Sequence, residues 1–301
     1  MPRYAAADAM RRALEDRLKA RARSGVVPLD RLRKEAAFQR LLARIAAVAP
    51  AGSWALKGGM AMIARAASRA RATVDVDATW RTDASGLVSM LEAAAPLDLD
   101  DYFQFLIGTP TPIQGEGPEG GLRFPVESRL AGRLFESLRL DINVLPDDPR
   151  PLENVALRNL FDFAELPAVV VPAVPPAQQL AEKLHAYTRN YGRQENTRAK
   201  DLYDMLLIAT ELPMPRLGDL TEACIATFEL RTTGWPPTLN SPPVGWEQPW
   251  SSFVRDYGAP FTTLEEAFSA LAVFWAPALV GEVPPESAWN AATWRWESVH
   301  A

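Results

Sequence analysis

Two aspartates, Asp75 and Asp77, are the strongest candidates for chemistry in this 301-residue sequence. They lie in the segment TVDVDATW (Thr73 to Trp80), which alternates polar and apolar residues as a half-buried β-strand does. Successive side chains of a strand point to opposite faces, so both carboxylates share one face while the valines belong to the core. Two like charges this close repel each other unless a cation lies between them.

Paired carboxylates of this kind suit a hard divalent cation. Magnesium and manganese favour oxygen ligands, and magnesium binds through one or two carboxylates together with the phosphates of a substrate. The alternative interpretation is an exposed strand face with two solvated aspartates. An Asp-x-Asp pair taken alone does not decide between the two.

A second strand offers a third carboxylate. In SLRLDINV (137–144), four apolar residues alternate with polar ones that include Arg139 and Asp141. If this strand neighbours the first in one sheet, Asp141 joins Asp75 and Asp77. Three carboxylates can hold two cations, which activate an attacking hydroxyl and neutralise a departing phosphate. An ordinary salt bridge is the alternative for Asp141.

A Gly-Gly turn precedes the Asp75 strand in the sequence. Lys57, Gly58 and Gly59 join a short strand to a helix. Glycines let the backbone approach a ligand closely, and the helix N-terminus offers N–H groups to phosphate. Such turns are commonly structural, and this one is no Walker loop. Its position makes it a candidate for nucleotide binding.

A further polar group lies in two predicted helices of the C-terminal half. Arg198, Asp201 and Asp204 recur at three-residue spacing beside an apolar stripe, and Lys183 lies off the apolar face of the preceding helix. Salt bridges on a helix surface are the alternative interpretation. We expect His185 to be a partly packed polar residue rather than a base.

The positions of these candidate side chains depend on the helices, strands and loops that carry them. A proline-rich segment, 169–179, is predicted to run as an extended connector, after which Gly192 can stop one helix and Thr197 can cap the next. The glycine cluster 115–121 is typical of a hairpin loop. Hydrophobic periodicity predicts helices near 10–18, 29–48, 60–67, 83–95 and 180–191 and a last one whose apolar stripe runs from Leu202 to Ala209, and strands at 54–57, 73–80, 102–107, 122–129 and 134–145.

The order of these motifs resembles the polymerase-β-like nucleotidyltransferases, in particular the AbiEii-type toxin family that includes MenT-like toxins. LKGGMAMIARAASRARATVDVD is similar to the family's first motif, and LRLDINV to its third carboxylate strand. AEKLHAYTRNYGRQENTRAKDLYDMLLI resembles its Glu-Lys-Leu helix and the following Arg-x-Lys-Asp-x-Tyr-Asp helix. Together they cover residues 54–208. Two departures stand out: Gly58-Gly59 replaces the Gly-Ser of the wider superfamily, and the spacing to Asp75 is longer.

The resemblance implies an α+β fold. A nucleotidyltransferase lobe with a mixed sheet and flanking N-terminal helices would occupy residues 1–170, and a mainly helical C-terminal lobe residues 171–301. The enzyme would transfer a nucleoside monophosphate from an NTP to an acceptor hydroxyl, with Mg²⁺ or Mn²⁺ as cofactor. The acceptor would be RNA, at the 3′ end of tRNA. The protein would act as a toxin with a cognate antitoxin protein as partner.

The resemblance also implies roles for individual residues. Asp75 and Asp77 would ligate the metals with Asp141, which would also help deprotonate the acceptor hydroxyl. Lys183 would contact the triphosphate. Lys57, Gly58 and Gly59 would take part in nucleotide binding. Asp204 or Asp201 would position Lys183 or the acceptor, and Lys183 and Asp204 would face the cleft.

Two other functions remain open from the sequence. The same fold could transfer a nucleotide to a protein side chain or to a small molecule such as an aminoglycoside. The chain could also be a catalytically silent nucleotide-binding module held by a partner through its C-terminal part. Three carboxylates and Lys183 argue against loss of activity.

Composition narrows the class of protein. A single cysteine, Cys224, excludes an intramolecular disulfide and favours a reducing cytoplasm, and with only His185 and His300 as further soft ligands a zinc site is not expected. No signal peptide or membrane span is evident. Residues 1–44 hold twelve Lys or Arg against five Asp or Glu, which predicts either a basic face for a polyanion or solvated helices. Seven of the nine tryptophans follow residue 212, and such density is typical of a core or an interface.

Overall fold

A computed structural model describes residues 4–25, 27–66, 69–71, 73, 75–113, 120–192 and 196–298. The chain divides into two compact units, each described here by itself. Unit 1 comprises Met1–Ser68 and Ala72–Val174, and unit 2 comprises Arg69–Arg71 and Pro175–Ala301. Val74, His300 and most of the predicted glycine loop lie outside the described residues.

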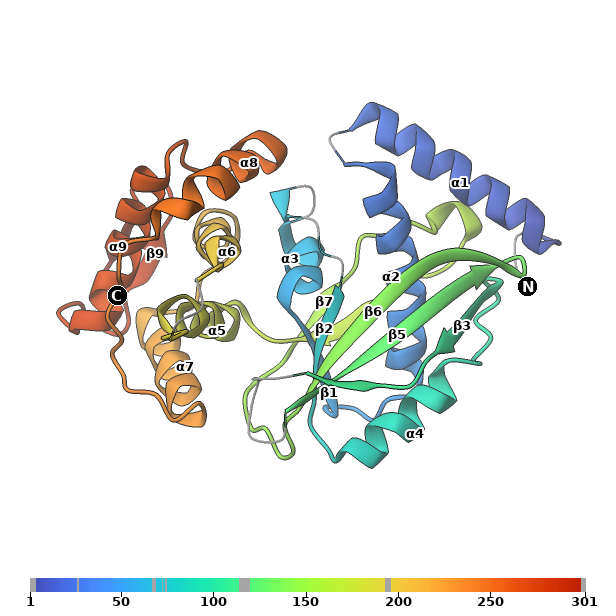
Figure 1. The fold of residues 1–301 in the computed structure, drawn as a ribbon, viewed down its shortest axis with the longest axis horizontal. Helices are drawn as coiled ribbons and strands as arrows, with labels where there is room; N and C mark the ends of the chain where they lie inside the picture. Colours follow the sequence, from blue (N-terminus) through green and yellow to red (C-terminus); the bar gives the residue numbers. More distant parts are fainter. Residues whose placement is uncertain are drawn as a thin grey trace. The chain divides into compact units, whose positions relative to one another are not determined.

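Unit 1 is built on a mixed sheet (Figure 1) with the strand order β3-β5-β6-β2-β1-β8-β7, and β4 pairs with β5. Strand β2 runs antiparallel to β1 and parallel to β6, and β6 runs antiparallel to β5. The predicted α+β class with a mixed sheet is confirmed. The strands are β1 Trp54–Lys57, β2 Asp75–Trp80, β3 Phe103–Ile107, β4 Thr111–Ile113, β5 Gly121–Leu130, β6 Arg133–Val144, β7 Glu153–Ala156 and β8 Val170–Ala173.

The helices of unit 1 cover the apolar side chains of this sheet. Helix α2 contacts α1, α4, β6 and β8, which explains why most of its residues are buried. Helix α3 contacts β1 and β2. The helices are α1 Ala7–Ser24, α2 Leu29–Val48, α3 Gly58–Ala66, α4 Ala84–Ala94 and the short 3-10 helix η2 Asp162–Ala164.

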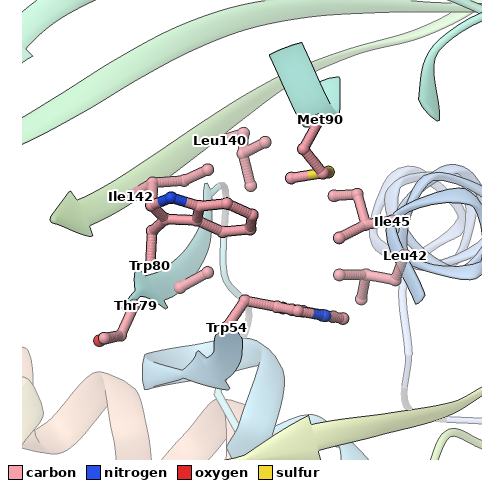
Figure 2. A pocket seen from close by; sticks show the side chains of 9 residues that line it. Leu42, Ile45, Trp54, Thr79, Trp80, Met90, Leu140 and Ile142 are labelled. Carbon is pink, nitrogen blue, oxygen red and sulfur yellow. The ribbon is translucent and has the colours of Figure 1, made fainter. Parts of the chain in front are cut away.

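The core between α2, α4 and the sheet is closely packed. Figure 2 shows side chains from α2, α4 and strands β1, β2 and β6 around a cavity of about 10 Å³. A void of this size and apolar lining is a packing defect rather than a ligand site. The Thr79 hydroxyl points away from these apolar side chains, is buried, and accepts no hydrogen bond within the described part of the chain.

We expect Thr79→Val to stabilise the protein by about 1 kcal/mol. Valine has nearly the same shape as threonine, so the change removes a buried hydroxyl without a partner and leaves the packing intact. Urea unfolding of both proteins measures the difference. The same change at the exposed Thr82 is the control and should leave stability unchanged. A clear loss of stability in Thr79→Val would show that the hydroxyl has a partner.

Many basic residues of the N-terminal helices are used inside unit 1. Arg44 donates two hydrogen bonds of 2.8 Å to the carboxylate of Asp101, and Arg40 donates one of 2.6 Å. All three side chains are buried. Arg11 donates to backbone carbonyls of the β5–β6 hairpin, and Arg33 binds Glu15. The positive balance of residues 1–44 is therefore partly structural rather than a free basic face.

Unit 2 is mainly helical. Its helices are α5 Pro176–Thr188, α6 Ala199–Glu211, α7 Leu217–Leu230, η3 Val244–Trp246, α8 Glu247–Tyr257 and α9 Leu264–Val280, followed by the hairpin β9 Ala288–Asn290 and β10 Arg295–Glu297. Helix α5 packs on α6 and α7, and α6 packs on α9. Among the described residues, no helix of either unit is long and apolar enough to cross a membrane.

The C-terminal tryptophans mainly build this unit. Trp289, Trp294 and Trp296 pack with Phe274 in one aromatic cluster, and each indole donates its N–H to a backbone carbonyl. Trp250 and Trp275 are fully buried. The predicted core role of these residues is confirmed.

The predicted connector 169–179 is extended in its first half, where Val170–Ala173 form β8, paired parallel to β1, and the chain passes from unit 1 to unit 2 after Val174. The prediction fails from Pro176, where α5 begins, because proline is well tolerated in the first turn of a helix. Two further local predictions were wrong. Helix α5 ends at Thr188 and not at Gly192. Thr197 does not cap α6. The Asn196 side chain accepts the N–H of Arg198 instead, and the helix begins at Ala199.

Candidate active site

Four charged residues form one row across the sheet of unit 1. Strand register places Lys57 of β1 opposite Asp77 of β2, Asp77 opposite Asp141 of β6, and Asp141 opposite Arg123 of β5. Cross-strand neighbours point to the same face, so the side chains of this row lie beside one another. The prediction that the two carboxylate strands are neighbours is confirmed.

Two arginines hold carboxylates of this face. Arg123 binds Asp141 through two hydrogen bonds, Nε to Oδ1 at 2.8 Å and a second from its terminal nitrogen at 2.5 Å. Arg139 lies opposite Asp75 and donates from Nε at 2.5 Å. The hydrogen bond to Asp141 is the main reason that the pKa of Arg123 is raised, and the negative charges of Asp75 and Asp77 add to it. The salt bridge foreseen as the alternative for Asp141 therefore exists, with Arg123 as its partner.

The Gly-Gly turn lies directly against Asp77. Gly58 has a φ of +62°, and a Cβ placed on it would lie 2.2 Å from Asp77 Oδ2. A Cβ on Gly59 would lie 2.7 Å from the Cβ of Thr73. Both glycines belong to the first turn of α3 rather than to a separate turn before it. Close approach of the helix start to the carboxylate strand thus requires glycine at both positions.

We expect Gly58→Ala to reduce the nucleotide transfer that the family resemblance implies at least about a hundredfold. The new methyl group must displace the Asp77 carboxylate, and an alanine in the left-handed region costs about 1–2 kcal/mol of backbone energy in addition. Transfer rate and thermal unfolding should be measured together. Gly132→Ala is the matched control, because Gly132 also has a positive φ but no atom within 4 Å of the new Cβ. Equal transfer by the two variants would contradict the importance of this contact.

The second group of predicted site residues is buried in unit 2. The Lys183 ammonium is 2.5 Å from an Asp204 carboxylate oxygen and 3.2 Å from Asp201. Arg71 also binds Asp204, at 3.0–3.2 Å, and Arg198 lies 3.6 Å from Asp201. Lys183, Asp201 and Asp204 are 6%, 5% and 1% exposed, so these are interior ion pairs and not the surface salt bridges of the alternative interpretation.

The charges of this cluster stabilise one another. Burial alone would lower the pKa of Lys183, but Asp204 and Asp201 outweigh it and the pKa is raised. Burial would raise the pKa of Asp204, yet Lys183 and Arg71 hold it below its ordinary value. His185 packs edge-on against Phe228, 5.0 Å between ring centroids, which confirms its packed role.

The sequence pattern missed three residues of these clusters. No local sequence pattern marks Arg71 as a site residue, because it lies in the segment between α3 and β2 and binds Asp204, 133 positions away. Arg123 was only one charge in a predicted hairpin strand. Arg139 was assigned to the face of Asp141, and its partner Asp75 was decided by strand register.

Two carboxylates of unit 1 offer oxygen atoms of the kind that a hard divalent cation takes as ligands. Asp77 and Asp141 offer carboxylate oxygens side by side, with Gly58 leaving room against Asp77. Asp75 and Asp141 are each held by an arginine. Among the described residues, no three acidic, histidine or cysteine side chains are gathered as around one ion. A bound cation would therefore compete with Arg123 and Arg139 for the carboxylates.

Comparison with known families agrees with this arrangement of elements. The sequence matches the family model "Nucleotidyl transferase AbiEii toxin, Type IV TA system" over residues 40–272, which include both clusters. The chain belongs to the AbiEii family. It is therefore a nucleotidyltransferase of a toxin–antitoxin type. No protein of curated function matches the sequence.

One solved structure shares the fold of this AbiEii chain, and two others match it less well. It is similar to MenT4, a nucleotidyltransferase toxin from Mycobacterium tuberculosis H37Rv, at a TM-score of 0.52 and 16% identity, covering 94% of this chain and 85% of that one. A protein from H. pylori assigned as a nucleotidyltransferase matches at a TM-score of 0.40 and 13% identity over 85% and 88% of the two chains. An antigenic nucleotidyltransferase-like protein from Paracoccidioides brasiliensis matches at 0.33 and 18% over 65% and 89%.

Family membership fixes the general chemistry of this AbiEii enzyme. Nucleotidyltransferases of this kind use an NTP and a divalent metal. A type IV toxin–antitoxin family also suggests an antitoxin as partner. Family membership identifies neither the acceptor nor the metal ion of this chain.

Proposed function

We propose that this protein transfers a nucleoside monophosphate from an NTP to the 3′-terminal hydroxyl of an RNA, with tRNA as the acceptor, and acts as a toxin in this way. The observation that carries the proposal is the row Asp77, Asp141 and Arg123 on one sheet face beside Gly58, in a chain of the AbiEii family. Carboxylates beside arginines can bind both a cation and the phosphates of an NTP.

The proposed ligands of Mg²⁺ or Mn²⁺ are Asp75, Asp77 and Asp141. When bound, such a cation neutralises the triphosphate and lowers the pKa of a coordinated hydroxyl. Arg123 binds Asp141 and Arg139 binds Asp75, and we propose that both arginines bind NTP phosphates when the carboxylates ligate the cation. Arginine suits this exchange because its planar donors match carboxylate and phosphate equally well.

The proposed reaction is an in-line displacement at the α-phosphorus of the NTP. The acceptor oxygen forms the new P–O bond, the bond to the β-phosphate breaks, and pyrophosphate leaves. Asp141, released from Arg123, accepts the proton of the acceptor hydroxyl. The backbone N–H groups of Gly58 and Gly59, at the start of α3, and the nearby Lys57 contribute positive potential toward bound phosphate.

For Lys183 we propose contact with the triphosphate, positioned by Asp201 and Asp204. An ammonium carries three donors, and the two carboxylates account for two of them. The pairing keeps Lys183 charged although its side chain is buried. A charged lysine for which the described residues account for two of three donors suits a phosphate oxygen better than it suits proton transfer.

The proposal that RNA is the acceptor rests on the family and on the exposed positive charge of α1. Arg12, Lys19, Arg21 and Arg23 are exposed on α1 and can attract an RNA, although several other arginines of residues 1–44 are used within unit 1. We expect binding of RNA to weaken with added salt.

The test is incubation of the purified chain with each α-labelled NTP, Mg²⁺ and total tRNA. We expect label in the tRNA band and none in tRNA whose 3′-terminal diol has been oxidised with periodate. Chelation with EDTA should stop transfer, and Mn²⁺ should restore it. Label in a protein or small molecule, or in periodate-oxidised tRNA, would contradict the proposed acceptor.

A further inference from the structure

A pocket of about 340 Å³ lies in unit 2 where α5 ends. Its volume is at the lower end of the range typical of small-molecule sites. The lining combines aromatic rings, carboxamides and one arginine: Tyr187, Arg189, Asn190, Tyr191, Asn240 and Trp246. Neither of the predicted clusters of site residues lines it.

Two aromatic residues that line this pocket are restrained by packing and by hydrogen bonds. Tyr187 and Trp246 are 5% and 2% exposed, and their rings meet edge to face at 5.5 Å. Each polar atom already has a backbone partner: the Tyr187 hydroxyl donates to the carbonyl of Asn240 at 2.8 Å, and the Trp246 indole donates to that of Asn196 at 2.6 Å. The rings are therefore fixed in place before any ligand binds, which reduces the entropic cost of binding.

The exposed residues at the edge of the pocket carry polar and charged groups. The Arg189 guanidinium lies 5.6 Å from the centre of the Tyr191 ring, and Arg189 itself is exposed. Asn190 and Asn240 are exposed beside it. The Asn190 oxygen accepts the N–H of Gly192 at 2.7 Å, and its NH₂ group can donate to a ligand, while the Asn240 carboxamide can donate and accept. An aromatic face, amide groups and one cation are what a base and its phosphate require.

A chain of polar contacts joins this pocket to Lys183 within unit 2. The Tyr191 hydroxyl accepts a hydrogen bond from Arg198 Nε at 3.0 Å. Arg198 lies 3.6 Å from Asp201, and Asp201 accepts from Lys183 at 3.2 Å. A ligand that moves Tyr191 would therefore act on the carboxylate that holds Lys183.

We propose that this pocket binds one nucleotide, with its base against Tyr191, its base edge on Asn190 or Asn240, and its phosphate on Arg189. The inference rests on the proposed function only in that the enzyme handles nucleotides. Two sources offer this chemistry: the terminal nucleotide of an acceptor RNA and the nucleoside part of a free NTP.

The test is calorimetric titration of the full chain carrying Asp77→Asn, a background that prevents turnover. The probes are each NTP and a short single-stranded RNA with a free 3′-hydroxyl. We expect Tyr191→Leu, and Asn240→Asp at an exposed position, to weaken binding of one probe at least about fivefold, because base stacking contributes 1–3 kcal/mol and an added carboxylate repels phosphate. Tyr191→Phe keeps the ring and loses only the hydroxyl that Arg198 contacts, so it should retain most of the binding that Tyr191→Leu loses. Arg255→Ala changes an exposed arginine outside the pocket and is the control.

The outcomes distinguish an RNA terminus from a free NTP as the ligand of the pocket. They also distinguish failure of the pocket proposal from failure of the proposed function. Weaker binding of RNA alone assigns the pocket to the acceptor, and weaker binding of NTP alone assigns it to the donor. Unchanged binding of both probes by folded variants overturns the pocket proposal, even if wild type transfers nucleotides. Pocket-dependent binding by a protein whose wild type transfers nothing to RNA would instead contradict the proposed function.

Discussion

Asp77→Asn is expected to abolish nucleotide transfer, with a loss of at least about a thousandfold in kcat/KM. Asp77 is the central carboxylate of the row, between Lys57 and Asp141, and it is the one against which Gly58 packs. Asparagine keeps the size of the side chain but removes the negative charge, so a divalent cation loses its best-placed ligand. Transfer of labelled NMP to tRNA at saturating Mg²⁺ measures the effect.

The control for this experiment is Asp16→Asn. Asp16 is exposed on α1 of the same unit and should be replaceable without loss of transfer. Thermal unfolding should show that Asp77→Asn is folded, because asparagine has nearly the same size as aspartate and fits the same space beside Gly58. Full transfer by folded Asp77→Asn would remove the proposed metal site. Partial rescue by Mn²⁺, which tolerates poorer ligand sets, would support it.

Asp204→Asn is expected to destabilise the protein by about 3–5 kcal/mol at neutral pH. Asp204 is 1% exposed and is bound by both Lys183 and Arg71. A neutral amide would leave the buried Lys183 with Asp201 as its carboxylate partner among the described residues, and would remove the Asp204 salt bridge of Arg71. Urea unfolding at several pH values measures the loss. Asp256→Asn, an exposed aspartate of the same unit that pairs with Arg255, is the control and should change stability little.

The stability lost in Asp204→Asn should depend on pH in a direction that the two pKa shifts determine. The pKa of Asp204 is lower in the folded protein than in the unfolded chain, so its contribution is present above the unfolded value of about 3.9 and disappears as the pH falls through the folded value. The pKa of Lys183 is raised, so its contribution is lost only at strongly alkaline pH. The difference between wild type and Asp204→Asn should therefore be largest near neutral pH and should shrink below about pH 4. A difference that is constant across this range would contradict the charge-based account.

Local patterns predicted the elements well. Strand periodicity identified β2 and β6 and the faces of their side chains, because apolar residues at alternate positions must turn toward one core. The start of α3 at Gly58 and the early end of α5 at Thr188 were not foreseen. The boundaries of helices depend on backbone partners such as the Asn196 side chain, which a hydrophobic pattern does not report.

The pair Asp75 and Asp77 shows where sequence and tertiary structure divide. The sequence by itself determined that both carboxylates share one face of a strand, since the period of two is a property of the extended backbone. Only the tertiary structure decided that Asp77 meets Asp141, that Arg139 holds Asp75, and that Gly58 presses on Asp77. Those contacts come from strand register and from residues up to 64 positions apart, which are set by packing of the whole core rather than by any local preference.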